Sequence, residues 1–98
     1  MNLSVTIPPV RTFAHVEASK AQALKPLEEA AEVFAAWQAR EAANELHHGV
    51  VSAGVALVDE CCDVITATCN LLSALGVTDL TEAMADCEKR NRERGRYE

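Results

Sequence analysis

The 98-residue sequence contains little glycine, little proline and few aromatic side chains: four Gly, three Pro and 4% Phe, Trp and Tyr together. Because residues that interrupt helices are scarce, and Ala, Leu and Val supply most of the apolar side chains, the composition predicts helices. One domain takes roughly 100–200 residues, so we expect a single domain over residues 1–98. A core with so few large side chains is thin, which favours an oligomer.

Long apolar runs and ordered cysteine patterns are absent as well. No stretch approaches the roughly 20 apolar residues that cross a bilayer, and residues 1–10 lack the basic and apolar regions of a signal peptide. The four cysteines have neither the spacing of a secreted disulfide framework nor that of a structural zinc site. We therefore expect a cytoplasmic protein that does not contact a membrane.

Basic residues are in the minority, with nine Lys and Arg against fifteen Asp and Glu and a net charge of −6. This balance argues against a nucleic-acid-binding surface, whose affinity comes from neutralising phosphates. Five of the nine basic residues nevertheless lie between Lys89 and Arg96. An acidic body with a basic tail suits a small phosphate-bearing ligand that is held near metal ions.

Two helical segments are expected in the first half of the chain, after an extended arm at residues 1–11. Thr12 is a candidate N-cap for a short helix over residues 13–24. Because proline fits the first turn of a helix and not its interior, we expect a second helix to begin near Pro26 and to run to about His47 or His48, with Gly49 as its stop. The apolar side of this second helix consists of Leu27, Ala30, Ala31, Phe34, Trp37 and Ala42.

The third helical segment, residues 50–75, is the most apolar part of the chain. It continues for about 25 residues without proline, a length that favours helix over strand despite its valines. Residues 49–58 and 64–78 contain no charged side chain. A helix that is apolar on nearly all sides is buried at the centre of a bundle or dimer.

A fourth, shorter helix is expected at the end of the chain. Gly76 ends the third helix, and Asp79 followed by Glu82 is a capping pattern for a helix that reaches about Arg92. A loose basic tail follows at residues 93–98. The sequence therefore predicts an all-α bundle of about four helices, assembled into a dimer or tetramer through the third helix.

Two pairs of acidic residues have helical spacing: Glu29 with Glu32, and Glu60 with Asp63. Residues three positions apart share one face of a helix, so two packed helices would bring four carboxylates together. Crowded carboxylates repel one another, and a hard divalent cation such as Mg²⁺ or Mn²⁺ removes that conflict. The first pair has an alternative role as solvated acids near a helix start. The second pair lies in an apolar segment without Lys or Arg, which favours a metal.

Two segments that contain these acidic residues resemble the sequence motifs of a known family. LEEAAEVFAAW (residues 27–37) followed by LVDECCDVI (residues 57–65) is similar to the E-E-x-x-E … E-x-x-D signature of MazG-like, all-α nucleotide pyrophosphohydrolases. That superfamily includes dimeric dUTPases, dCTP pyrophosphatases and phosphoribosyl-ATP pyrophosphohydrolase. The closing segment LTEAMADCEKRNRERGRY also resembles the family's Lys/Asn/Arg-rich end. The resemblance covers roughly residues 24–97.

The resemblance implies a role for each acidic residue of the two motifs. Glu29, Glu32, Glu60 and Asp63 match the family's metal ligands, and Glu28 matches a residue that binds outside the first coordination sphere or acts as a base. The cofactor implied is Mg²⁺, with Mn²⁺ as an alternative. The reaction implied is cleavage of a nucleoside triphosphate to the monophosphate and pyrophosphate.

Further residues are candidates for substrate binding. Lys89, Asn91 and Arg92 match the family's tail and are expected to hold the outer phosphates. Trp37 is the only tryptophan and is a candidate for stacking on a base, although a core or interface position is the commoner outcome. Asn70 lies two turns after Asp63 on nearly the same face, so it contacts either the ligand or a neighbouring helix.

The sequence thus predicts a Mg²⁺-dependent nucleoside triphosphate pyrophosphohydrolase that acts in nucleotide-pool housecleaning as a homodimer or homotetramer. Two alternatives remain open. One is a phosphoribosyl-ATP pyrophosphohydrolase, although the residues after Asp63 lack the Tyr-His that commonly follows the motif in that family. The other is a helical dimer that binds nucleotide without hydrolysing it.

Overall fold

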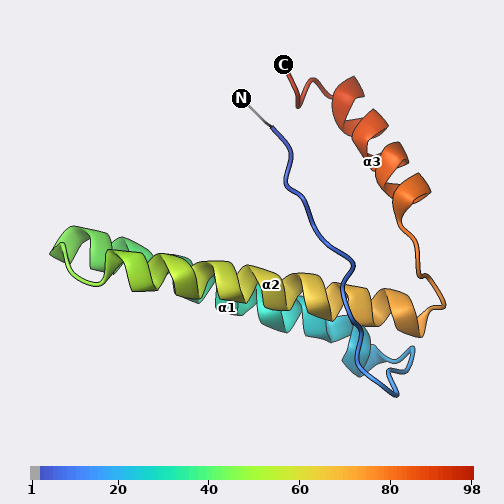
Figure 1. Cartoon of the computed structure of the whole chain (residues 1–98), viewed down its shortest axis with the longest axis horizontal. Helices are drawn as coiled ribbons and strands as arrows, with labels where there is room; N and C mark the ends of the chain where they lie inside the picture. Colours follow the sequence, from blue (N-terminus) through green and yellow to red (C-terminus); the bar gives the residue numbers. More distant parts are fainter. Residues whose placement is uncertain (1–2) are drawn as a thin grey trace.

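The computed structural model of the chain describes residues 3–98, and the part it describes contains three α-helices and no strand. Helix α1 spans Lys20–Leu46, α2 spans Val50–Ala74 and α3 spans Thr81–Glu93. Helices α1 and α2 lie antiparallel as a long hairpin, and α3 stands apart from it (Figure 1). The predicted all-α class is confirmed, whereas residues 3–98 form three helices where about four were expected.

The N-terminal boundary differs from the prediction. Residues 13–24 do not form a separate helix; a turn at residues 14–15 is followed by the start of α1 at Lys20. The hydroxyl oxygen of Ser19 accepts a hydrogen bond from the Gln22 backbone N–H at 3.2 Å and caps the helix there. Pro26 consequently lies inside α1 and does not begin it. Its ring removes one backbone hydrogen bond, and the helix continues for twenty residues beyond it.

The hairpin turn is made by three residues, 47–49. His47 takes a left-handed conformation (φ 53°) as the C-cap of α1, and Gly49 (φ 71°) is the N-cap of α2. The predicted stop at Gly49 is therefore displaced to His47, and the glycine instead turns the chain into the second helix. Because this turn is so short, α1 and α2 have to pack side by side.

The second half of the chain follows the prediction more closely. Helix α2 covers the expected segment, and Gly76 (φ 80°) terminates it as predicted, with the Val77 N–H donating to the Leu72 carbonyl at 2.9 Å. Helix α3 begins at Thr81, two residues after the expected cap. The Asp79 side chain accepts hydrogen bonds from the Thr81 N–H at 2.9 Å and from the Thr81 hydroxyl at 2.6 Å, so it fixes the turn that leads into the helix.

The contact between α1 and α2 follows a regular seam. Positions along it alternate in steps of four and three residues, the spacing of a left-handed coiled coil. On α1 the half-buried positions are Gln22, Pro26, Glu29, Val33, Ala36, Arg40 and Ala43. On α2 the least exposed positions include Val50, Ala53, Leu57, Glu60, Val64, Ala67, Leu71 and Ala74. Each helix thus contributes one glutamate to an otherwise largely apolar seam.

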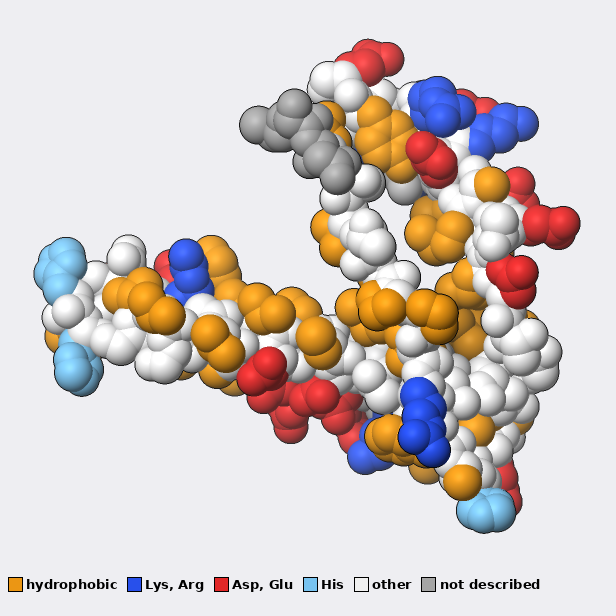
Figure 2. All heavy atoms as spheres, viewed as in Figure 1, with side chains coloured by type: hydrophobic (Ala, Val, Ile, Leu, Met, Phe, Trp, Pro, Cys, Tyr) orange, Lys and Arg blue, Asp and Glu red, His pale blue; other side chains and the backbone are white. Residues whose placement is uncertain are grey.

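Most large apolar side chains lie outside the seam. Leu27 and Phe34, predicted to face inward from α1, are 67% and 62% exposed. Helix α2 carries a second apolar stripe roughly opposite the seam, which includes Val51, Val55 and Val58, exposed by 83%, 57% and 62%. Figure 2 shows hydrophobic side chains spread along the hairpin on the visible face. A single chain therefore does not bury α2, contrary to the expectation for a bundle centre.

Burial is sparse throughout residues 3–98, where only Ala67 (8% exposed) and Asn70 (3%) are fully buried. The N-terminal arm crosses α2 at this point, because the Phe13 backbone N–H donates to the Asn70 side-chain oxygen at 2.8 Å (Figure 1). Within the described part of the chain, α3 makes no helix–helix contact with α1 or α2. No helix among the described residues is both long and apolar enough to span a membrane.

Candidate metal centre

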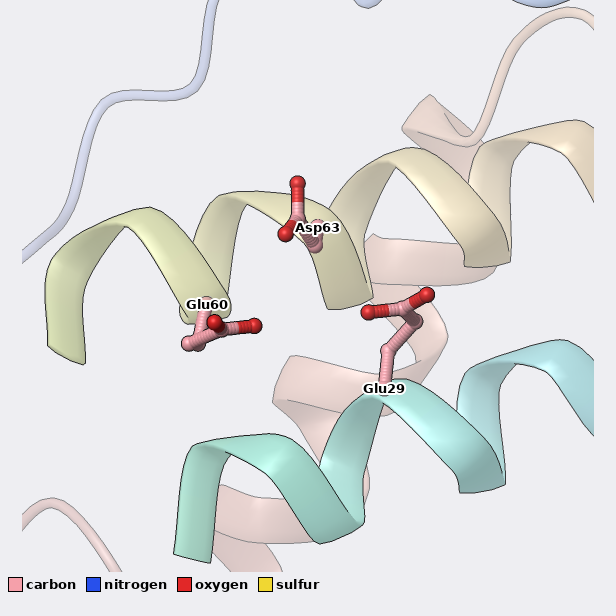
Figure 3. Close-up of side chains that lie close together, drawn as sticks. All are labelled: Glu29, Glu60 and Asp63. Atoms are coloured by element: carbon pink, nitrogen blue, oxygen red, sulfur yellow. The ribbon is translucent and has the colours of Figure 1, made fainter. Parts of the chain in front are cut away.

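Three carboxylates meet between α1 and α2: Glu29 from the first helix, and Glu60 and Asp63 from the second. One oxygen atom from each lies within 4.8 Å of the oxygen atoms of the other two. In Figure 3, Glu29 extends from α1 toward α2, and Glu60 points into the space between the helices. We refer to these three residues as the carboxylate cluster.

The hairpin itself creates this arrangement. Glu29 and Glu60 both occupy seam positions, so the antiparallel pairing places their side chains opposite each other. Asp63 follows Glu60 by three residues and therefore lies on the neighbouring part of the same face. Helical spacing predicted that the acidic residues share a face, and the register of the hairpin brings the two faces together.

Burial, together with electrostatic crowding in the cluster, raises the pKa of two of its members. Burial raises the pKa of Glu60 above its usual value, and Glu32, Asp63 and Glu29 each raise it further. Burial also raises the pKa of Glu29, with Glu32 and Asp63 acting in the same direction and Lys25 opposing them. The protonated carboxyl is favoured at both positions because burial penalises the charged form, and repulsion between the neighbouring carboxylates adds to that penalty.

Glu60 carries an unsatisfied polar atom. Its Oε2 oxygen is shielded from solvent and has no hydrogen-bond partner within residues 3–98. A shielded carboxylate oxygen without a donor is unfavourable unless a proton or a cation reaches it. Three carboxylates from two helices form an all-oxygen donor set, the kind that hard cations such as Mg²⁺, Mn²⁺ and Ca²⁺ bind. The residues present therefore fit a divalent cation.

The remaining acidic candidates lie at different distances from the cluster. Glu32 is close enough to Glu29 and Glu60 to raise the pKa of both, although it is not one of the three residues whose oxygens converge. Glu28 turns away and forms an exposed ion pair with Lys25, with 3.2 Å between Nζ and Oε2. In the single chain, Glu28 is thus engaged in a contact on the helix surface.

The predicted substrate-binding residues are brought together only in part. Lys89, Asn91 and Arg92 lie on α3, which contacts neither hairpin helix, so one chain does not place them at the cluster. Arg92 instead pairs with Glu88 at 3.7 Å. Trp37 is 43% exposed on α1, with the Arg40 guanidinium carbon 5.5 Å from its ring centroid. The role of these residues in substrate binding stays a prediction.

Asn70 is the substrate-binding candidate that does lie beside the cluster. It lines a cavity of about 340 Å³ whose wall also includes Glu29 and Asp63. The lining residues that sequence reasoning missed include Phe13, Gln22, Lys25 and Thr66. Helical spacing contained a signal for three of them, because Gln22 and Lys25 precede Glu29 by seven and four positions and Thr66 follows Asp63 by three. No local pattern indicates that Phe13 reaches this point.

The chain matches no protein-family model, no curated protein and no solved structure with which it was compared. The resemblance to MazG-like enzymes therefore depends on the residues of the two acidic motifs and of the tail.

Proposed function

We propose that this protein is a Mg²⁺-dependent nucleoside triphosphate pyrophosphohydrolase of the MazG-like type, which releases a nucleoside monophosphate and pyrophosphate. The observation that carries the proposal is the convergence of Glu29, Glu60 and Asp63 from two helices. These residues come from the two acidic motifs on which the resemblance rests. A cluster of three carboxylates, with Lys25 as the one cation among the described residues that acts on Glu29, carries excess negative charge and suits the binding of a divalent cation and, through it, of phosphates.

In this proposal the carboxylate cluster would hold the cation, and Glu32 would assist from its position beside Glu29 and Glu60. A bound divalent cation supplies charge neutralisation at phosphate oxygens and lowers the pKa of a water molecule. The raised pKa of Glu60 means that this residue holds a proton at a higher pH than an isolated glutamate does. Cation binding and protonation therefore compete for the same oxygens.

The direct test is release of pyrophosphate from a panel of common ribo- and deoxyribonucleoside triphosphates, measured with Mg²⁺ and with EDTA. We expect Mg²⁺-dependent release from at least one nucleotide and loss of release to background in Glu60→Gln. Glu45→Gln is the matched control, because Glu45 is an exposed glutamate of α1 outside the cluster. Full activity in Glu60→Gln would contradict the assignment of the site.

Two alternatives are separated by the same assay. Release of pyrophosphate from phosphoribosyl-ATP and from none of the common triphosphates would identify a phosphoribosyl-ATP pyrophosphohydrolase. Calorimetric binding of nucleotides with no release above background would identify a nucleotide-binding protein without hydrolase activity. The proposed enzyme requires turnover of a common triphosphate.

The shape of the chain supports assembly into a homo-oligomer as part of this proposal. A compact monomer of 10.6 kDa exposes about 5,500 Å², whereas this chain exposes 8036 Å². Its radius of gyration is 16.3 Å, against about 13 Å for a compact domain of this length. The excess surface, about 2,500 Å², is of the size that an obligate interface buries. A second copy packed on the apolar stripe of α2 would remove much of it.

A further inference from the structure

The cavity beside the carboxylate cluster has the chemistry of an organic ligand site. Its volume of about 340 Å³ falls within the range of roughly 300–1,000 Å³ that is usual for small-molecule sites. Glu29 and Asp63 form one part of its wall, and an aromatic ring, two carboxamides and a hydroxyl are contributed by Phe13, Gln22, Asn70 and Thr66. Lys25 and Ala67 complete the wall, which thus combines charged, aromatic, amide and hydroxyl groups.

Asn70 presents hydrogen-bond donors to this cavity. Its side chain is buried, and its Oδ1 oxygen accepts from the Phe13 backbone N–H at 2.8 Å. Because only the oxygen of a carboxamide accepts, this bond fixes the amide orientation and leaves the NH₂ group on the other side. Within residues 3–98 the Nδ2 atom has no hydrogen-bond partner. Glu60 Oε2 is the only solvent-shielded side-chain oxygen or nitrogen without a partner among the described residues, so the Nδ2 donors of Asn70 remain accessible and can bind an acceptor in the cavity that Asn70 lines.

Phe13 and Thr66 add two further recognition elements. The Phe13 backbone N–H is held by Asn70, and Phe13 lines the cavity as a residue that is 66% exposed, so it is accessible to a flat ligand. The Thr66 hydroxyl donates to the Cys62 carbonyl at 3.0 Å, which leaves its oxygen lone pairs free to accept. Stacking together with amide and hydroxyl contacts is the usual means of binding a nucleobase.

We propose that this cavity binds the nucleobase of the nucleotide whose phosphates lie at the carboxylate cluster, with Phe13 stacked on the base and the Asn70 amide donating to an acceptor on its edge. This inference rests on the proposed function, because the cluster has to hold the phosphates for the base to reach the cavity. It adds the N-terminal arm to the site and assigns base recognition to residues of a single chain.

The test separates binding of the base from binding of the phosphates. Isothermal titration calorimetry on the full chain with Mg²⁺ would use α,β-imido analogues of dATP, dGTP, dCTP and dUTP, and tripolyphosphate as a probe without a base. We expect one analogue to bind at least tenfold more tightly than tripolyphosphate. Phe13→Ala should weaken that analogue roughly tenfold and leave tripolyphosphate unchanged. Ile7→Ala, an exposed position of the same arm, should change neither.

A matched pair of threonines tests the cavity wall. Thr66→Val should weaken the preferred analogue roughly fivefold, whereas Thr68→Val should not. Thr68 makes the same kind of bond to the Val64 carbonyl at 2.8 Å but does not line the cavity. Asn70→Asp keeps the acceptor for the Phe13 N–H and removes the donors, so it should change which analogue binds best. Circular dichroism of each variant checks that the helices are retained.

The outcomes distinguish this inference from the proposed function. The base does not occupy the cavity if the analogues and tripolyphosphate bind the wild-type protein equally, or if Phe13→Ala and Thr66→Val leave analogue binding unchanged. In either case the proposal that the carboxylate cluster binds the phosphates is retained. If neither probe binds with Mg²⁺, both the proposed function and this inference are wrong. A selective loss of analogue affinity in Phe13→Ala and Thr66→Val supports the inference.

Discussion

Replacing Val51, Val55 and Val58 together by alanine tests whether the apolar stripe of α2 is an interface between copies of the chain. The three side chains are 83%, 57% and 62% exposed. Each substitution removes two methyl groups, at about 0.8 kcal/mol for each when fully buried. When this energy is scaled by the three exposed fractions, the triple variant loses about 3 kcal/mol of favourable association free energy per chain, and about 6 kcal/mol per symmetric dimer.

This loss corresponds to an increase of about four orders of magnitude in the dimer dissociation constant, as an upper bound that applies if the stripe is fully covered. Alanine has high helix propensity, so α2 itself should persist in the variant. Sedimentation velocity over a range of protein concentrations measures the association directly. Leu46→Ala is the control, because Leu46 is equally exposed but ends α1 at the hairpin turn, away from the stripe.

Two results would refute the reasoning about the stripe. Wild-type protein that sediments as a 10.6 kDa monomer at all concentrations would show that the excess surface is not covered by a second copy. A wild-type oligomer whose dissociation constant is unchanged in the triple variant would place the interface elsewhere, for example on the face of α1 that carries Leu27 and Phe34.

Two further predictions concern the site and the fold. The pKa values of Glu29 and Glu60 are raised in the folded protein, which therefore binds their protons more tightly than the unfolded chain does. The metal-free protein should thus lose stability as the pH rises from about 4.5, the ordinary glutamate pKa, through the raised values. Thermal melts should show this dependence weakened in Glu60→Gln. Stabilisation by Mg²⁺ at neutral pH should fade as the pH falls through the raised pKa values, because protons displace the cation; an identical pH dependence in Glu60→Gln would contradict the raised pKa of Glu60. Ser19→Ala should lower stability by about 1 kcal/mol, or about 5 °C in the melting temperature, because α1 loses its N-cap; an unchanged melting temperature would mean that the helix starts elsewhere.

The boundaries of the helices show where local sequence patterns were sufficient and where they were not. The 25-residue length of α2, its lack of proline and its glycine stop were readable directly from the chain. The expected helix start near Pro26 is wrong, because Ser19 and Gln22 match the Ser-x-x-Gln capping pattern and Ser19 caps α1 seven residues earlier in the chain than the proline. A capped first turn and a long helix beyond it outweigh the loss of one hydrogen bond at a proline.

The acidic site was predictable in its parts. Helical spacing identified Glu60 and Asp63 as carboxylates on one face of an apolar helix, and Glu29 and Glu32 as a similar pair. Spacing alone did not determine that Glu29 occupies the seam, that Glu32 lies just outside the convergent set, or that Glu28 pairs with Lys25 on the surface. Each of these depends on how α1 is rotated about its axis against α2.

The sequence by itself determined the helical class, the extent of α2 and the acidic residues available to a cation, because composition, proline and glycine positions and the period of 3.6 residues act locally. Only the tertiary structure decided which carboxylates meet, because their convergence requires the three-residue turn and the register of the hairpin. It also decided that Phe13 lies against Asn70, 57 positions away in the chain. A contact over that separation depends on the path of the whole arm, and no local pattern in the sequence encodes that path.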